Sequence, residues 1–315
     1  MSRNKFSGVL PEGLGECTEL QYLFMDGNSY QGDIPSSYCS LASLQEIDFS
    51  HNNLSGLIPT SFSKLQYLDL GSNRLTGKIP DSLGNLSFLS GLYLDHNQLE
   101  AKKPPSIGKC QSLLYLNLSG NELNGTLDAE VFTGSAKFLE LDFSNNHVEG
   151  PVPSEISKQT NLGLLVMSRN KFSGVLPEGL GDCTELQYLF MDGNSYHGDI
   201  PSSYCSLASL QEIDFSHNNL SSPIPTCFSK FPLTYLDLSH NNFQGSVPTN
   251  SVFANASEIF LVGNSRLCGG IPELHLPKCV EIGNMPRNKR TIPHALKFII
   301  PVISALAGVL AIVTG

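Results

Sequence analysis

The sequence is poor in charged residues and has no concentrated positive surface. Only 15% of its 315 residues are charged, and 19 Lys and Arg against 29 Asp and Glu leave a net charge of −10. Phosphate binding needs clustered basic side chains, and here they are scattered until the C-terminal tail. This composition disfavours nucleic acid as a partner.

The sequence also lacks the short motifs of common catalytic sites. It has no H-E-x-x-H, no C-x-x-C, no Gly-rich phosphate loop after a strand, and no kinase signature set. We therefore expect no catalytic residue, no cofactor and no metal site. A kinase domain would have to lie beyond Gly315.

The residues that are abundant indicate a regular, turn-rich and well-packed chain. Apolar residues make up 40% of the sequence, with 28 Gly and 19 Pro. So many Gly and Pro residues would break the long helices of a helical bundle, and the apolar content is too high for a disordered chain. Such a composition calls for a search for internal repeats.

One asparagine recurs along most of the chain. The period is about 24 residues, which is typical of stacked repeats, and the shortest step runs from Asn52 to Asn73. The repeated pattern is L-x-x-L-x-L-x-x-N-x-L-x-G-x-I/L/V-P, as in Ile47, Phe49, Asn52 and Pro59. The asparagines are Asn4, Asn28, Asn52, Asn73, Asn97, Asn121, Asn146, Asn170, Asn194, Asn218, Asn241 and Asn264.

The pattern predicts a solenoid of stacked repeats. Alternating apolar residues such as Ile47 and Phe49 make a short strand with one buried face. Five or six buried side chains contribute roughly 1.5–3 kcal/mol each, while fixing about 24 residues costs about 1–2 kcal/mol per residue, so one repeat cannot fold alone. We predict an α/β solenoid with parallel strands on its concave face, in which each Asn has a structural role.

The segment after each asparagine carries a resemblance to a known family. Gly8–Pro11, Gly32–Pro35 and Gly77–Pro80 fit G-x-I/L-P, and over residues 1–264, about 11 or 12 units, the chain resembles the plant-specific class of leucine-rich repeats. The resemblance implies a second small sheet and a curved right-handed superhelix. Ala101–Pro104 and Gly125–Asp128 depart from the pattern, so an interruption of the second sheet is predicted there.

The C-terminal end resembles a narrower group. Val252–Cys279 is similar to the capping segment of plant receptor kinases of the immune subfamily that recognises bacterial proteins. The resemblance implies a cysteine cap at residues 265–283 with a disulfide between Cys268 and Cys279; the alternative is two free thiols. It also implies a ligand-binding ectodomain, with a co-receptor kinase at the C-terminal repeats.

The C-terminal end of the chain, residues 295–315, predicts a transmembrane helix. These residues are almost wholly apolar, and as a helix they would span about 31 Å, the thickness of a bilayer core. A buried terminal helix is the alternative. Residues 284–294 form a basic juxtamembrane linker, whose charges would place that flank in the cytoplasm, whereas the resemblance places the repeats outside the plasma membrane.

The N-terminal end shows neither a signal segment nor a cysteine-bearing cap. We interpret the chain as truncated at both ends. The alternative for a chain without a signal is that the C-terminal helix inserts and the repeats stay in the cytosol.

Part of the chain is present twice. Residues 1–64 match residues 167–230 with five differences, at positions 16, 31, 56, 57 and 61 of the first copy. The second copy starts seven whole repeats after the first, with Asn4 matching Asn170, so both copies fit one solenoid. The match indicates a recent duplication, an unequal exchange or an assembly error in the gene model.

Binding residues are predicted at the outward strand positions six and four residues before each asparagine. Rigid aromatic side chains are typical interface anchors, and a column of Asp favours a basic peptide or protein. The alternative is that these residues are surface fillers with strand propensity. They are Tyr22, Phe24, Asp48, Tyr67, Asp69, Tyr93, Tyr115, Asp142, Tyr188, Phe190, Asp214, Tyr235 and Asp237.

Six N-x-S/T sequons predict glycosylation if the chain is exported, at Asn53, Asn85, Asn117, Asn124, Asn219 and Asn255. Asn117 lies in an outward strand column, so a glycan there would block the middle of the concave face. The remaining cysteines are interpreted as buried or locally paired, without assigned partners: Cys17, Cys39, Cys110, Cys183, Cys205 and Cys227.

Four histidines form one column directly before the asparagine, at His51, His96, His217 and His240. We interpret them as part of the repeat consensus, with pH-tuned binding as the alternative. The longest step between asparagines runs only from Asn121 to Asn146, so the chain lacks the large island found in steroid-hormone receptors of similar type. A peptide or protein ligand is therefore favoured.

Three functions remain open at this stage. The first is the ectodomain of a receptor-like kinase or receptor-like protein that acts in defence or development signalling. The second is a secreted-inhibitor-like repeat protein that binds microbial wall-degrading enzymes, against which the C-terminal helix argues. The third is a decayed receptor-gene fragment without independent activity.

Overall fold

The computed structural model describes residues 1–101, 106–134 and 137–279. The chain divides into a repeat unit, Met1–Lys278, and a second unit, Cys279–Gly315, of which only Cys279 is described. The predicted linker and transmembrane helix lie outside the described residues. Among the residues that are described, no helix is both long and apolar enough to cross a membrane.

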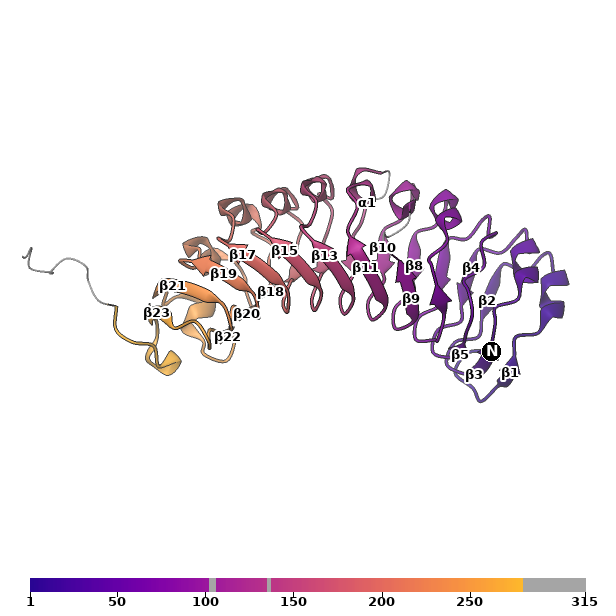
Figure 1. The fold of residues 1–315 in the computed structure, drawn as a ribbon, viewed down its shortest axis with the longest axis horizontal. Coiled ribbons are helices and arrows are strands. Elements are labelled where there is room, and N and C mark those ends of the chain that lie inside the picture. The colour runs from indigo at the N-terminus through magenta and orange to yellow at the C-terminus, as the bar shows by residue number, and fades with distance from the viewer. Residues whose placement is uncertain (102–105, 135–136, 280–315) are drawn as a thin grey trace, which may run out of the picture. The chain divides into compact units, whose positions relative to one another are not determined.

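The repeat unit contains a long parallel sheet on the inside of its bend (Figure 1). Each strand buries its middle residue, such as Ile47 or Leu68, and turns the residues on either side outward. The eleven strands are β2 (Tyr22–Phe24), β4 (Glu46–Asp48), β6 (Tyr67–Asp69), β8 (Gly91–Tyr93), β10 (Tyr115–Asn117), β12 (Glu140–Asp142), β14 (Leu164–Val166), β16 (Tyr188–Phe190), β18 (Glu212–Asp214), β20 (Tyr235–Asp237) and β22 (Ile259–Phe260).

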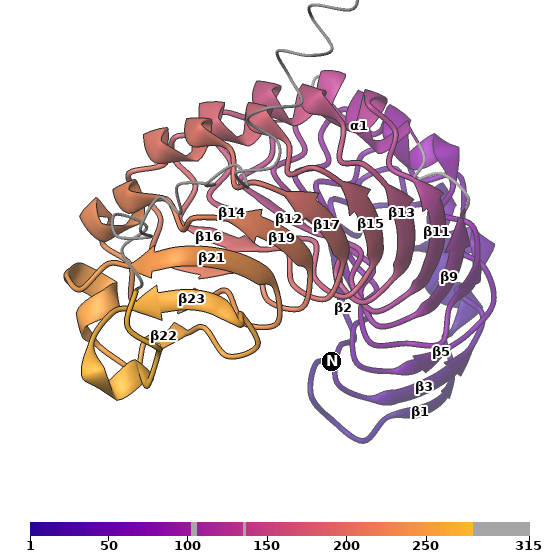
Figure 2. The same ribbon diagram turned by 60° about the vertical axis from the view of Figure 1, so that its left-hand side comes forward.

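A second set of strands follows the asparagines, as the resemblance implied, and runs along the edge of the stack (Figure 2). The first group is β1 (Ser7–Val9), β3 (Ser29–Gly32) and β5 (Asn53–Leu54). The second group is β7 (Thr76–Gly77), β9 (Gln98–Ala101), β11 (Glu122–Thr126), β13 (His147–Gly150), β15 (Lys171–Gly174), β17 (Ser195–Gly198), β19 (Asn219–Ser222), β21 (Asn242–Val247) and β23 (Arg266–Gly269).

The predicted place of the interruption is wrong. Strands β9 and β11 pair with each other and with both neighbours, so the sheet continues through the two units that depart from the pattern. The break lies between β5 and β7 instead. The step from Asn52 to Asn73 is the shortest in the chain, yet the register is kept. The Arg74 amide donates to the Leu54 carbonyl at 2.8 Å, at the same positions relative to the asparagines as the Gln98 amide and the Leu75 carbonyl one repeat later. Backbone contact persists, since the Thr76 amide donates to the Gly56 carbonyl at 2.8 Å.

Short 3₁₀ helices cover the outside of the bend (Figure 1). Seven of them follow a proline whose carbonyl accepts the bond that opens the turn, as Pro11 does from the Leu14 amide at 3.1 Å. The ten 3₁₀ helices of the described residues are η1 (Glu12–Glu16), η2 (Ser36–Ser40), η3 (Asp81–Asn85), η4 (Ser106–Lys109), η5 (Ser154–Lys158), η6 (Glu178–Asp182), η7 (Ser202–Ser206), η8 (Thr226–Lys230), η9 (Ser251–Ala254) and η10 (Pro272–Leu274).

The α-helical share is smaller than an α/β solenoid suggests. Within the described part of the chain, the one α-helix is α1 (Glu130–Thr133). The short repeats leave only four or five residues for the outer side of most units, which suits the tighter i→i+3 turn better than a full α-helix.

The recurring asparagine ties each repeat to the one before it. The Asn73 amide donates to the carbonyls of Leu70 and Gly71 in its own turn, at 3.1 and 3.2 Å. It also donates to the Phe49 carbonyl, while its oxygen accepts from the Leu54 amide at 2.9 Å. Asn97, Asn121 and Asn146 do the same, which confirms the predicted structural role.

The apolar side chains of all repeats form one continuous core. It runs from Leu10 to Leu267, and it includes the residue three positions before each asparagine from Asn28 onward. Examples with no exposed surface are Phe49, Phe143 and Phe215. Every repeat buries its neighbour's core, so the outward faces of the long sheet are held on a rigid support.

Candidate functional site

All thirteen predicted binding residues lie on the long sheet with their side chains on its outward face. We call this face the strand surface, and its positions six and four residues before the asparagine the first and second columns. Tyr22 is 50% exposed and Phe24 is 39% exposed, while the other eleven are half-buried. Neighbouring strands pair in register, so each column forms a continuous row. The structure thus brings the predicted residues onto one surface.

Aromatic rings contact one another across the strand surface. The Tyr67 and Tyr93 ring centroids are 5.3 Å apart, and the Tyr22 and Phe24 centroids are 6.3 Å apart. Tyr235 contacts Phe260 at 5.5 Å. Sequence reasoning missed Phe260, which is 41% exposed, although its place four residues before Asn264 is the signal that would have found it.

The Asp column has a structural role that was not predicted. Each Asp accepts a hydrogen bond from the backbone amide two residues on, which closes the turn after the strand. The Asp69 Oδ1 accepts from Gly71 at 2.9 Å, and Asp214 and Asp237 accept from Ser216 and Ser239 at 2.9 and 2.8 Å. One carboxylate oxygen therefore belongs to the fold, and the other faces the surface.

Burial weakens the acidity of several groups on this surface. Desolvation raises the pKa of Asp69 to about 6 and the pKa of Asp214 to about 6, and it also raises the pKa of Asp142. It raises the pKa of both Tyr93 and Tyr235 to about 12, with neighbouring carboxylates adding to the shift. The surface thus changes charge between about pH 5 and 7.

Asn117 takes the place of an Asp in the second column. Its side-chain oxygen accepts from the Ser119 amide at 3.0 Å and from the Ser119 hydroxyl at 2.7 Å. An amide therefore serves the turn as well as a carboxylate does. Asn53 and Asn124 are also half-buried, and Asn85, Asn219 and Asn255 are exposed. Glycosylation of the six sequons stays a prediction.

The histidine column has a conformational cause. His51, His96, His217 and His240 all adopt positive φ, between 50° and 54°. Other repeats place Gly, Asn, Ser or Arg at the same position with positive φ. Histidine and asparagine tolerate this left-handed region better than most residues. Within the described residues, no group of three or more His, Cys, Asp or Glu is arranged to hold a metal ion.

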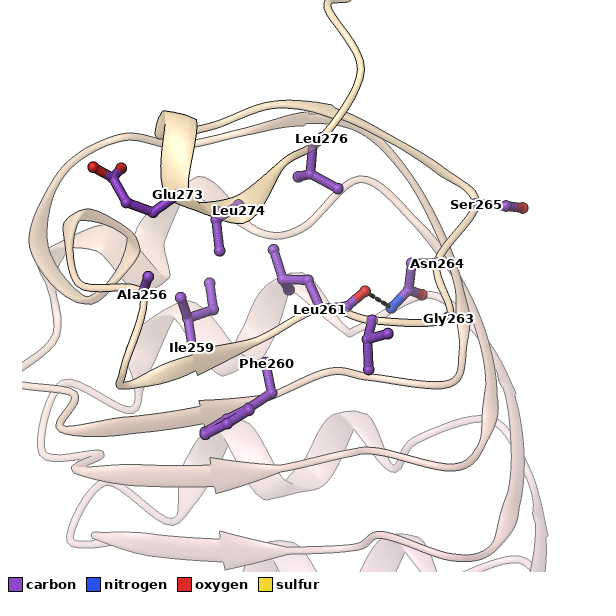
Figure 3. A pocket seen from close by; sticks show the side chains of 11 residues that line it. Ala256, Ile259, Phe260, Leu261, Gly263, Asn264, Ser265, Glu273, Leu274 and Leu276 are labelled. Carbon is purple, nitrogen blue, oxygen red and sulfur yellow. Dashed lines mark hydrogen bonds between the residues drawn. The ribbon is translucent and has the colours of Figure 1, made fainter.

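Two of the hollows among the described residues lie at the middle and at the C-terminal end of the sheet. One, of about 460 Å³, lies in the middle of the strand surface between Tyr115, Glu140, Leu164 and Tyr188. The other, of about 540 Å³, lies at the C-terminal end (Figure 3). There Ile259, Leu261 and Leu274 point into the hollow, and Phe260 points away from it.

The cysteines fall into three groups. Cys205 and Cys227 form a disulfide between neighbouring repeats. Cys110 and Cys183 are free and buried, but Cys39 is free and half-buried and Cys17 is free and exposed, which contradicts the interpretation that all six are buried or paired. Its repeat is the first of the described stack, so no earlier repeat covers it. Cys268 and Cys279 are each disulfide-bonded, and their mutual pairing remains a proposal.

Sequence comparison places these repeats among known ones. Three family models, each described as a leucine rich repeat, match the chain: one matches residues 42–99, the second matches residues 209–231 and 232–251, and the third matches residues 109–126. The LRR receptor-like serine/threonine-protein kinase EFR of Arabidopsis thaliana is 54% identical over 43 residues, which are 14% of this chain and 4% of that protein.

Solved structures share the architecture. A TDR receptor has a TM-score of 0.72 and 33% identity over 77% of this chain and 42% of that chain. The structure described as PEPR1-AtPEP1 has a TM-score of 0.71 and 29% identity over 84% of this chain and 41% of that chain.

The stacked repeats, the asparagine ladder and these matches define a leucine-rich-repeat fold. More particularly, the repeats are similar to those of plant receptor ectodomains, a fold that is itself non-catalytic. The chain spans less than half the length of these two receptor structures.

Proposed function

We propose that the chain is the ligand-binding part of a plant cell-surface receptor and that its strand surface binds an extended peptide or a protein segment. The observation that carries the proposal is the row of partly exposed aromatic side chains, Tyr22, Phe24, Tyr67, Tyr93 and Tyr188, on a rigid sheet. Rigid aromatic groups give large contact area at low entropic cost.

Charge favours a basic ligand. The second column presents Asp48, Asp69, Asp142, Asp214 and Asp237 within a chain of net charge −10. Each of these Asp side chains uses one oxygen for its own turn. The second oxygen of Asp69 and that of Asp237 also accept from a tyrosine hydroxyl, and a carboxylate oxygen can accept a further bond from a ligand. Complementary charge would speed association and select among partners.

The solved structures support a peptide as the ligand class. The structure described as PEPR1-AtPEP1 and that of GASSHO1/SCHENGEN3 with CASPARIAN STRIP INTEGRITY FACTOR 2 are complexes of receptors on this fold. By this proposal the repeats lie outside the plasma membrane, a co-receptor kinase binds at the C-terminal repeats, and the output is defence or development signalling.

The test is a binding screen of secreted plant peptides against the full chain in detergent, with a double variant, Tyr67→Ala with Tyr93→Ala, as the comparison. A true ligand should lose at least about tenfold in affinity, because two central anchors are truncated. Val175→Ala, on a side chain exposed away from the strand surface, is the matched control and should bind as the wild type does. Ligands that bind all three proteins equally would contradict the proposal.

A further inference from the structure

The strand surface carries the same arrangement of side chains twice. We call the two sets the N-station and the C-station. The N-station lies on β2, β4, β6 and β8 and consists of Phe24, Asp48, Asp69 and Tyr93 with Tyr67. The C-station lies on β16, β18, β20 and β22 and consists of Phe190, Asp214, Asp237 and Phe260 with Tyr235. In each station, the second-column residues on the four successive strands are an aromatic residue, two Asp and a second aromatic residue.

The sequence duplication accounts for only half of this match. Residues 1–64 and 167–230 contain the first two strands of each station, whereas the third and fourth strands lie outside the duplicated segment. The five differences between the copies all fall outside the long sheet. The stations are therefore alike both where the sequence was copied and where it was not.

The local geometry of the two stations is also the same. The Tyr67 hydroxyl donates to the Asp69 Oδ2 at 3.2 Å, and the Tyr235 hydroxyl donates to the Asp237 Oδ2 at 3.4 Å. The Tyr67 and Tyr93 rings lie 5.3 Å apart at 41°, and the rings of Tyr235 and Phe260 lie 5.5 Å apart at 44°. Two independent pairs of strands thus present one contact pattern.

The chemistry of a station fits a guanidinium group. An arginine side chain pairs with carboxylates through its planar fork and stacks on aromatic faces. Two adjacent carboxylates between two aromatic rings offer both interactions at once. Among the described residues, Arg3 and Arg169 pair with Asp26 and Asp192, and Arg266 donates to the Asn242 carbonyl, so none of these three arginines pairs with a station carboxylate.

We propose that the strand surface is bivalent and binds two arginine-bearing peptide segments at once, one at each station. This inference rests on the proposed function and names its ligand chemistry and stoichiometry. Seven strand spacings of about 4.8 Å place the stations roughly 34 Å apart along the sheet. One partner that fills both stations therefore needs about ten extended residues between its two arginines.

The test counts sites by isothermal titration calorimetry, with the peptide Gly-Phe-Arg-Phe-Gly added to the full chain in detergent. Five residues reach at most about 17 Å, so this probe cannot bridge the stations. We expect two sites per chain, with affinities within about tenfold of each other. The same peptide with citrulline in place of arginine should bind at least tenfold more weakly, because citrulline has no charge.

Two double variants assign the sites. Asp48→Asn with Asp69→Asn should remove the N-station, and Asp214→Asn with Asp237→Asn should remove the C-station, each leaving one site. Asn117 shows that an amide still closes the turn. The proteins must be made without N-glycosylation, because the changes at Asp48, Asp214 and Asp237 each create an N-x-S sequon.

Asp33→Asn with Asp199→Asn is the matched control. Like each station variant, it removes two negative charges, here one from each copy, at exposed positions away from the strand surface. It should keep two binding sites. A single site in the wild type, two sites in both station variants, or no binding of the probe would overturn the bivalent arginine surface. The proposed function would survive any of these results if the peptide screen yields a ligand sensitive to the Tyr67 and Tyr93 changes.

A linked probe provides a second measurement. Two copies of the five-residue segment joined by a flexible linker of about twelve Gly and Ser residues should bind at least tenfold more tightly than one copy, and each station variant should abolish that gain. Equal affinity of the linked and single probes would contradict simultaneous occupation.

Discussion

The two near-identical copies, residues 1–64 and 167–230, show how much of a repeat's structure comes from its neighbours. Phe6 and Phe172 are equivalent, and each stacks on a tyrosine in its own copy, at 6.4 and 6.2 Å. Yet Phe6 is 47% exposed whereas Phe172 has no exposed surface. The repeat before Phe172 covers it, and no described repeat lies before Phe6.

The copies differ at their other ends as well. Residues 226–230 form the helix η8 with Phe228 fully buried, while the matching residues 60–64 form no helix and Phe62 is only partly buried. The step from Asn52 to Asn73 is shorter than the matching step from Asn218 to Asn241. Two nearly identical segments therefore take different local structures, and they differ in repeat length and in the disulfide of Cys227, which has Ser61 as its counterpart.

The largest expected effect comes from truncating the equivalent phenylalanines. Phe172→Ala should lower the free energy of unfolding by about 3–5 kcal/mol, because it leaves a cavity in a closed core. Phe6→Ala should cost less than about half of that, since water already reaches the ring. Denaturant unfolding monitored with hydrogen exchange in each copy would measure both. Equal losses would show that the first copy is as well packed as the second.

The next largest loss of stability is expected when the disulfide between Cys205 and Cys227 is removed. Cys227→Ser gives the second copy the residue of the first, Ser61, and should cost about 3 kcal/mol for a sequence separation of 22. The difference should vanish in reducing buffer. The reverse change, Ser61→Cys beside Cys39, is the matched control, and mass spectrometry would detect a new disulfide. A loss that persists under reduction would mean that the bond is not the cause.

A smaller effect is expected where the copies differ at Gly56 and Ser222. Gly56 has a φ of 74°, and a Cβ there would meet the Asp33 carboxylate. Gly56→Ser should therefore destabilise the first copy by about 1–2 kcal/mol. Ser222→Gly should be neutral or stabilise the second copy by under about 1 kcal/mol, since Ser222 already has a positive φ of 143°. Thermal unfolding of both variants would rank them. A neutral Gly56→Ser would show that the turn adapts.

The smallest effect concerns pH. The pKa of Asp69 is raised to about 6 in the folded chain, above the unfolded value of about 3.9. The folded state thus holds more protons than the unfolded state, and stability should fall as pH rises from about 4 to about 6. Asp69→Asn should be more stable than the wild type at pH 7 and equal to it near pH 4. Thermal melts across that range would measure this. A melting-temperature difference between the two proteins that stays the same at every pH would show that the Asp69 carboxyl does not titrate and would contradict the prediction.

Much of the fold followed from the sequence, because the repeat pattern fixes which residues are buried. Ile47 and Phe49 alternate as a half-buried strand requires, and Asn73 makes the ladder bonds that its position predicts. The outer helices did not follow, since a short run of residues after a proline fits both α and 3₁₀ turns. The predicted sheet break was misplaced because strand pairing is a backbone interaction, and β9 pairs on both sides although Ala101 replaces the glycine of the pattern.

The candidate surface was predictable in position and only partly in role. Period-two alternation was enough to place Tyr67 and Asp69 on the outward face. The turn-closing bond of each Asp depends on the residue two positions on, a pairing that was overlooked. The partnership of Cys205 with Cys227 depends on which side chains meet across two repeats, which spacing alone does not give.

The most direct test of the account is oxidative footprinting of the full chain with and without a peptide from the binding screen. The account predicts protection of Tyr67, Tyr93 and Tyr235 on the strand surface, and unchanged labelling of Leu57 and Val175, which are exposed away from it. Protection of Leu57 and Val175 with unchanged tyrosines would contradict the strand surface as the ligand-binding site.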